Sequence, residues 1–165
     1  VGSEMCIRDR LYDRNSRLLI LGSFPSVKSR EMRFFYGHPQ NRFWRVIAAL
    51  TDYPVPHTIE DKKKMLHENH IALWDTIASC EIEGSSDSSI KGVVPNNLNI
   101  ILETAPIQAV YCNGSKSYEL YHKYCEKQTG MPAFKLPSTS PANAACSLGR
   151  LIKEWSVIMD RLREV

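Results

Sequence analysis

Three polar side chains that could take part in chemistry stand at the ends of predicted structural elements. Asp75 follows the apolar run 71–74, Asn113 follows the run 109–112, and Asn41 directly precedes an amphipathic segment, residues 42–50. A carboxylate can accept a proton from water, and a side-chain amide can meet a hydrogen-bond donor and an acceptor at once. Two simpler interpretations stay open, since Asn41 could be a helix N-cap and Asn113 a turn residue before Gly114.

The elements that position these residues alternate along the chain. Apolar runs predict strands at 17–21, 71–74, 109–112 and 134–136. Amphipathic spacing and capping signals predict helices at 42–50, 58–67, 97–104, 115–130 and 148–162, and the polar segment 81–89 is predicted to be a loop. This alternation is typical of a parallel sheet covered by helices on both faces. The carboxyl ends of its strands meet at one edge, so residues 22–26, Asp75, Asn113 and residues 137–141 should converge there.

The stretch from Gly22 to Leu50 concentrates basic and aromatic residues. Between residues 28 and 45 the basic side chains outnumber the acidic ones by four, whereas the whole chain carries +3. Such a local excess predicts a face that docks a polyanion, although a solvated basic loop has the same composition. The run from Phe34 to Tyr36 lies beside Gly37 and His38, where an aromatic ring could stack on a base or belong to the core.

Two motifs in this chain resemble the uracil-DNA glycosylase superfamily. The first combines GSFPS at residues 22–26 with YGHPQNRFW at 36–44, and the second is LPSTSPANAA at 136–145. The resemblance runs from about residue 18 to residue 162, and its nearest branch is that of the DNA-deoxyinosine (hypoxanthine-DNA) glycosylases. It implies an α/β fold, a three-layer α/β/α sandwich with a central four-stranded, mainly parallel sheet. It also implies a monofunctional enzyme that flips hypoxanthine, or uracil, out of DNA and hydrolyses its N-glycosidic bond without a cofactor or a metal.

The resemblance, the convergence of the strand ends and the basic excess together suggest a role for each candidate residue. The catalytic positions would be Asn41 and Asp75. The base-binding positions would be Gly22, Ser23, Phe24, Tyr36, His38 and Asn113. The DNA-binding positions would be Ser26, Lys28, Arg30, Arg33, Arg42, Ser138, Thr139, Ser140, Pro141, Ala142 and Asn143.

The chain departs from the family pattern at two places. Relatives have a water-holding Asn or an Asp where this chain has Phe24, so Asn41, Asp75 or a backbone carbonyl must position the water. Relatives insert Leu or Arg into the base stack where this chain offers Pro141 and Ala142. A small wedge suits lesions that pair weakly, because their flipping costs least.

Recognition of hypoxanthine places a condition on Asn113. Hypoxanthine offers an O6 acceptor beside an N1–H donor, and adenine presents the reversed pair. An amide that is free to rotate would accept either base. Selectivity therefore requires neighbours that fix the orientation of the Asn113 amide.

Length and composition agree with one globular domain. The chain has 165 residues, of which 43% are hydrophobic and 24% are charged, and we expect a single domain over residues 11–165. The first ten residues resemble a non-native leader. No apolar run has the length of a membrane span, so we expect a cytoplasmic protein. We also expect a monomer, whose partner is DNA that contains a deaminated base. Five cysteines without a C-x-x-C pair argue against a disulfide framework, a zinc site or an iron–sulfur cluster.

Other functions stay open at this level. One alternative is a mismatch-specific uracil-DNA glycosylase, and another is a non-catalytic module that binds DNA lesions or single strands through the basic and aromatic face. A hydrolase that uses Ser23, His38 and Asp75 is disfavoured, because no G-x-S-x-G elbow is present.

Overall fold

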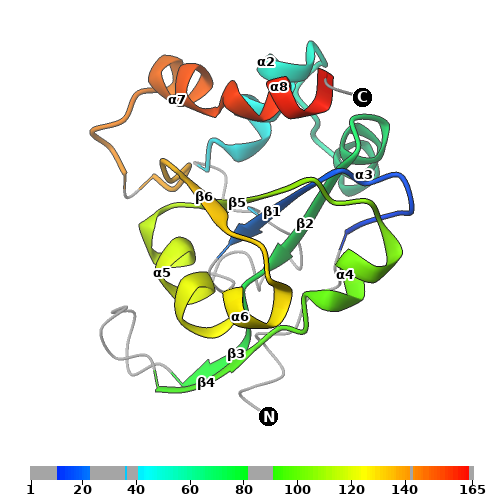
Figure 1. The fold of residues 1–165 in the computed structure, drawn as a ribbon. Helices are drawn as coiled ribbons and strands as arrows, with labels where there is room; N and C mark the ends of the chain where they lie inside the picture. Colours follow the sequence, from blue (N-terminus) through cyan, green and yellow to red (C-terminus); the bar gives the residue numbers. More distant parts are fainter. Residues whose placement is uncertain (1–10, 23–35, 37–40, 82–90, 142, 164–165) are drawn as a thin grey trace.

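A four-stranded parallel sheet forms the centre of the protein, in the order β2–β1–β5–β6 (Figure 1). The computed structural model describes residues 11–22, 36, 41–81, 91–141 and 143–163. The strands are β1 (Leu18–Gly22), β2 (Ile71–Asp75), β5 (Ala109–Asn113) and β6 (Ala133–Leu136). All four lie where the apolar runs predict them. The parallel direction is confirmed for every neighbouring pair.

Helices cover the sheet on two sides, which confirms the predicted three-layer α/β/α arrangement (Figure 1). On one side lie α2 (Phe43–Thr51), α3 (Ile59–Glu68), α7 (Leu148–Trp155) and α8 (Val157–Arg163). On the other lie α4 (Asn99–Thr104), α5 (Ser115–Tyr124) and α6 (Glu126–Thr129). In the strand order β2–β1–β5–β6 the chain moves first to one side of β1 and then to the other, so right-handed crossovers place helices on both faces.

Four details differ from the sequence-based prediction. The helix predicted at 115–130 is divided at Cys125 into α5 and α6. A two-stranded antiparallel sheet, β3 (Ile77–Glu81) with β4 (Lys91–Pro95), flanks the segment that was predicted as a loop, of which residues 82–90 lie outside the described residues. The long final helix is two helices that meet at Ser156. The N-cap of α5 is Gly114, with φ +96°, rather than Ser115, which is the first helical residue.

The central strands are buried along their whole length. Every residue of β1 and β2 is buried, as expected of strands that have helices on both faces. The edge strand β6 exposes Phe134 and Lys135. Phe43 at the start of α2 is fully buried and meets Trp155 of α7 edge to face, with ring centroids 5.8 Å apart, which fixes α2 against α7.

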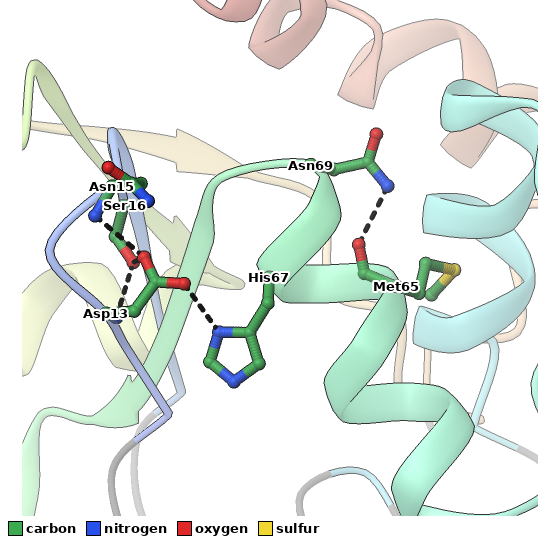
Figure 2. A network of polar contacts seen from close by, with 6 residues as sticks. All are labelled: Asp13, Asn15, Ser16, Met65, His67 and Asn69. Atoms are coloured by element: carbon green, nitrogen blue, oxygen red, sulfur yellow. Dashed lines mark hydrogen bonds and ion pairs between the residues drawn. The ribbon is translucent and has the colours of Figure 1, made fainter.

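Hydrogen bonds join the amino ends of β1 and β2 on the edge opposite the predicted site. Arg17 N donates to His70 O at 2.8 Å. Figure 2 shows the turn before β1, in which Asp13 Oδ1 accepts from Asn15 N and from Ser16 Oγ, while Asp13 Oδ2 lies 3.1 Å from His67 Nδ1 at the end of α3. These contacts hold α3 to the sheet.

Within the described ranges, no helix has both the length and the apolar character needed to cross a bilayer.

Candidate active site at the carboxyl edge of the sheet

The ends of β1 and β2 bring three of the predicted site residues together. Gly22 pairs with Asp75 across the two strands, and Asp75 is buried. A methyl group built on Gly22 would lie 3.0 Å from Asp75 Oδ1 and 3.2 Å from the hydroxyl oxygen of Tyr36. The carboxylate and the phenol therefore flank the same glycine, which leaves no room for a larger side chain at position 22.

Buried hydroxyl groups fix this strand end from behind. Thr76 donates to the carbonyl oxygen of Gly22 twice, from its N at 2.7 Å and from its Oγ1 at 2.8 Å. Ser117 of α5 donates from Oγ to Leu21 O at 2.8 Å. Asn96 Nδ2 donates to Asp75 O. These bonds satisfy carbonyl oxygens at the strand ends beyond the hydrogen bonds of the sheet, so the backbone around Gly22 is held in one position.

Tyr36 is held against the core by one face of its ring. The ring stacks on Phe43 with centroids 4.2 Å apart and an interplanar angle of 23°. Its backbone is left-handed, with φ 51°, which is uncommon for a bulky residue and indicates that tertiary contacts fix it. Tyr36 thus packs on the core with one ring face while its hydroxyl group reaches the carboxyl edge.

Asn41 and Asn113 are joined by Thr139, which belongs to the second motif. Thr139 Oγ1 donates to Asn41 Oδ1 at 2.9 Å and accepts from Asn113 Nδ2 at 3.0 Å. Thr139 N donates to Asn113 Oδ1, also at 3.0 Å. Asn41 Oδ1 accepts a second bond from Phe43 N at 2.9 Å, but the N-cap of α2 is Arg42, so Asn41 stands one residue before the cap. Residues from three separate regions of the chain therefore form one hydrogen-bonded unit.

The burial of Thr139 argues against the DNA-binding role predicted for it. Its side chain and backbone are fully buried, and its carbonyl oxygen accepts from Arg42 N at 3.1 Å. Each of its polar groups thus has a partner inside the protein. Thr139 joins the two amides inside the protein, where a phosphate does not reach a fully buried side chain.

Arg42 also makes its hydrogen bonds inside the protein. Its Nη1 donates to Cys146 O. Its Nη2 donates to Ser140 O and to Asn143 O, and both of these bonds are 3.0 Å long. The guanidinium group therefore holds the carbonyl groups of residues 140–146 together. An arginine engaged in this way supports the loop, which argues against a phosphate contact through the same guanidinium group.

The second-motif loop has further internal supports. Trp155 Nε1 donates to Pro137 O at 2.9 Å, Asn143 Nδ2 donates to Ser138 O at 3.0 Å, and Ser140 N donates to Ser138 Oγ at 3.1 Å. Gly114 lies against this loop, since a methyl group there would stand 3.1 Å from Ser138 Cβ. Ser138, Ser140, Pro141 and Asn143 remain partly exposed, so their contact with DNA stays a prediction.

The thiols behind the sheet edge are not poised for nucleophilic chemistry. Burial raises the pKa of Cys112 to about 12 and that of Cys125 to about 11. Cys112, Cys125 and Cys146 are buried and unbridged. Across the described part of the chain, no three His, Cys, Asp or Glu side chains gather in a way that could hold a metal ion.

Eight of the predicted site residues lie outside the described residues and stay predictions: Ser23, Phe24, Ser26, Lys28, Arg30, Arg33, His38 and Ala142. The residues that the prediction missed are Thr76, Asn96 and Ser117, which fix the strand ends. Their only sequence signal is a small polar residue close to a strand end, which many turns share.

Comparison with known proteins places this geometry in a family. A sequence model of the uracil DNA glycosylase superfamily matches residues 10–157. A hypoxanthine DNA glycosylase from Methanosarcina acetivorans is 35% identical over 148 residues, which cover 88% of this chain and 92% of that protein. A hypoxanthine DNA glycosylase from Methanosarcina barkeri is 35% identical over 109 residues, 65% of this chain and 69% of that protein.

A solved structure agrees with the sequence matches. The solution NMR structure of a Methanosarcina acetivorans protein described as a uracil DNA glycosylase superimposes with a TM-score of 0.81 at 33% identity, over 94% of this chain and 96% of that one. With its four-stranded parallel sheet and the described parts of both motifs at the carboxyl edge, the chain belongs to the uracil DNA glycosylase superfamily.

Proposed function

We propose that this protein is a monofunctional DNA glycosylase that excises hypoxanthine from DNA, with uracil as a second substrate, and leaves an abasic site. Its expected partner is DNA that contains a deaminated base, and we expect it to act as a monomer in the cytoplasm. The two relatives named hypoxanthine DNA glycosylase support the choice of base.

One observation carries the proposal. Asn41 and Asn113 are hydrogen-bonded to the same residue, Thr139, at the edge where Asp75 and Tyr36 flank Gly22. Two neutral amides, a carboxylate and an aromatic ring suit a planar, uncharged base and the sugar attached to it. They do not suit an acyl-transfer reaction, which needs an activated nucleophile.

The proposed reaction is hydrolysis of the bond between C1′ of the sugar and N9 of hypoxanthine. The bond breaks with its electron pair going to the base, and an oxocarbenium-like sugar remains. A water molecule adds through its oxygen to C1′. Its surplus proton passes to the site, where Asp75 is the proposed acceptor, and finally to the departing base. The net change is the addition of one water across the glycosidic bond, so neither an oxidant nor a metal is required.

Binding and chemistry would use different faces of the second-motif loop. The partly exposed residues Ser138, Ser140, Pro141 and Asn143 are proposed to press on the DNA beside the flipped nucleotide. The buried Thr139 faces the two amides instead. A loop held by Arg42 and Trp155 can press on DNA without itself changing shape.

Labelled duplexes test the proposal directly. The protein is incubated with duplexes that carry inosine, uracil, a thymine mismatch or no lesion, and alkali then cleaves any abasic site. Cleavage at inosine supports the proposed enzyme, and cleavage only at uracil mismatches would replace it with a mismatch-specific uracil enzyme. A shifted but uncut duplex would instead indicate a binding module.

Substitution of Asn41 assigns the chemistry to this site. Asn41→Ala should lower the single-turnover rate by about a hundredfold or more while the affinity for DNA stays the same, because it removes a group that acts in the transition state. It should also cost about 1 kcal/mol of stability, because the bond to Phe43 N is lost.

Thr58→Ala is the matched control for that stability loss. Thr58 caps α3 by accepting from Asp61 N at 3.0 Å, far from both motifs in the sequence. It should cost a similar free energy of unfolding and leave the excision rate unchanged. Equal rates for the two variants would show that Asn41 has only a structural role before α2.

A further inference from the structure

The hydrogen bonds around Thr139 fix the direction in which each amide faces. Two backbone N–H groups set the polarity, because a backbone N–H can only donate. Phe43 N donates to one atom of the Asn41 amide, which must therefore be its oxygen, and Thr139 N donates likewise to the oxygen of Asn113. Neither amide can be flipped without leaving a buried donor facing a donor.

The hydroxyl group of Thr139 then has only one possible arrangement. Asn41 Oδ1 has no proton, so Thr139 Oγ1 donates to it. The same hydroxyl oxygen accepts from Asn113 Nδ2. With its N bound to Asn113 and its O bound to Arg42 N, Thr139 uses each of its polar groups and is fully buried.

This arrangement uses up the acceptor capacity of Asn41. A carbonyl oxygen has two lone pairs, and those of Asn41 Oδ1 accept from Phe43 N and from Thr139 Oγ1, each at 2.9 Å. The group of Asn41 that remains for the substrate side is Nδ2, which only donates.

We propose, on the basis of the glycosylase function above, that Thr139 is a positioning residue that makes Asn41 a hydrogen-bond donor to the reacting atoms, through Nδ2. Asn41 does not hold the nucleophilic water through its carbonyl oxygen. Its N–H donates to the departing base or to the oxygen of the water, and the acceptor for the proton of that water is Asp75. A donor at this place stabilises the negative charge that the base gains as the glycosidic bond breaks.

Asn113 is restricted by the same residue. Its Oδ1 and Nδ2 bind two groups of one residue, Thr139 N and Oγ1, so both bonds lie on the same edge of the amide. That edge is the one that would pair with O6 and N1–H of hypoxanthine together. While it is bound to Thr139, Asn113 can offer a base only one hydrogen bond on either flank, and its orientation is fixed as selectivity requires.

Asn41→Asp separates the donor role from the acceptor role. The carboxylate keeps an oxygen for Phe43 N and Thr139 Oγ1 and changes only the remaining group, from an N–H donor to an acceptor. The proposal predicts that Asn41→Asp loses about as much inosine excision at neutral pH as Asn41→Ala, a hundredfold or more. Its rate should rise as the pH falls, because a protonated carboxyl group can donate again. Wild-type or higher activity of Asn41→Asp at neutral pH would overturn the proposal.

Thr139→Val and Thr139→Ser test the positioning residue. Valine keeps the shape and the backbone N–H but removes the hydroxyl group, and serine keeps the hydroxyl group. Valine should lower the single-turnover rate roughly tenfold to a hundredfold, with DNA affinity within about twofold of wild type, and serine should restore most of the rate. A wild-type rate in Thr139→Val, or no recovery with serine in a folded protein, would overturn the role of Thr139.

Hydrogen exchange of the side-chain amides gives a readout that does not depend on activity. In ¹⁵N-labelled protein, the Asn113 Nδ2 proton bound to Thr139 Oγ1 should exchange slowly in the wild type and in Thr139→Ser, and quickly in Thr139→Val. If the wild type excised no base, the proposed function would fail, and slow exchange would still establish that Thr139 fixes the orientation of the amides. Fast exchange in the wild type would refute this fixed orientation even in an active enzyme.

Discussion

Gly22→Ala tests whether the carboxyl edge is the active site without removing any chemical group. The added Cβ would lie 3.0 Å from Asp75 Oδ1 and 3.2 Å from Tyr36 Oη, whereas ordinary van der Waals contacts begin at 3.4 Å. The methyl group thus intrudes by about 0.4 Å on the carboxylate and by about 0.2 Å on the phenol. Gly22 has no left-handed backbone, so alanine adds no conformational strain of its own.

The two neighbours cannot move at low cost. Asp75 is buried, and Tyr36 stacks on the fully buried Phe43. Overpacking of this kind costs about 1–3 kcal/mol of stability. Because displacements below 1 Å at reacting groups are already felt, we expect the single-turnover rate of inosine excision to fall roughly tenfold to a hundredfold. The affinity for an undamaged duplex should not change, since Gly22 lies inside the proposed base pocket.

Gly149→Ala is the control. Gly149 is exposed near the start of α7, and a methyl group there meets nothing within 4 Å. This variant should be neutral or more stable by up to about 1 kcal/mol and fully active. Urea unfolding and single-turnover excision are measured for both variants. Wild-type excision by a folded Gly22→Ala protein would refute the placement of the active site at this edge.

Two further predictions concern the guanidinium group of Arg42 and the buried thiols of Cys112 and Cys125. Arg42→Lys keeps the charge but loses the bonds to the loop carbonyl groups, so it should lower the unfolding free energy by about 2–4 kcal/mol and leave the salt dependence of DNA binding unchanged; a flatter salt dependence would indicate a phosphate contact after all. Burial raises the pKa of Cys112 to about 12 and of Cys125 to about 11, from an ordinary 9.0, so their contribution to stability is complete below pH 9 and is lost as the pH rises towards these values. Urea unfolding is measured between pH 8 and 11. Above pH 9 each thiol should lower the free energy of unfolding by about 1.4 kcal/mol per pH unit, and Cys112→Ala should remove the contribution of one thiol. An equal slope in the variant would assign the alkaline loss to other groups.

The sheet was predictable because its signals are local. Each parallel strand is a short, continuous apolar run, and burial on both faces produces that pattern. The pair β3 and β4 was missed because neither strand is a continuous apolar run and a polar segment separates the two. Their pairing depends on contacts between distant residues. The break at Ser156 was missed for a related reason, since the apolar stripe runs through it while Ser156 Oγ bonds to Lys153 O.

The location of the site was predictable, but its hydrogen-bond network was not. Parallel topology alone brings Gly22, Asp75 and Asn113 to one edge. The role of Thr139 depends on partners 98 and 26 positions away, and its neighbours Ser138 and Ser140 offer the same hydroxyl chemistry. Only the structure distinguishes the buried hydroxyl from the exposed ones. The positive charge of Arg42 similarly suggests a phosphate, whereas its position commits it to carbonyl groups.

The adjacent residues Asn41 and Arg42 connect the two motifs in different ways. The Asn41 side chain binds the side chain of Thr139, and Arg42 binds the backbone of the same loop from Thr139 to Cys146. The part of the loop proposed to press on DNA is thereby attached to the amide proposed to act on the base. Hydrogen bonds in a buried network strengthen one another and need no rearrangement when charge develops. A glycosylase that lacks the usual water-holding residue of its first motif can therefore rely on a donor whose direction is fixed before the DNA arrives.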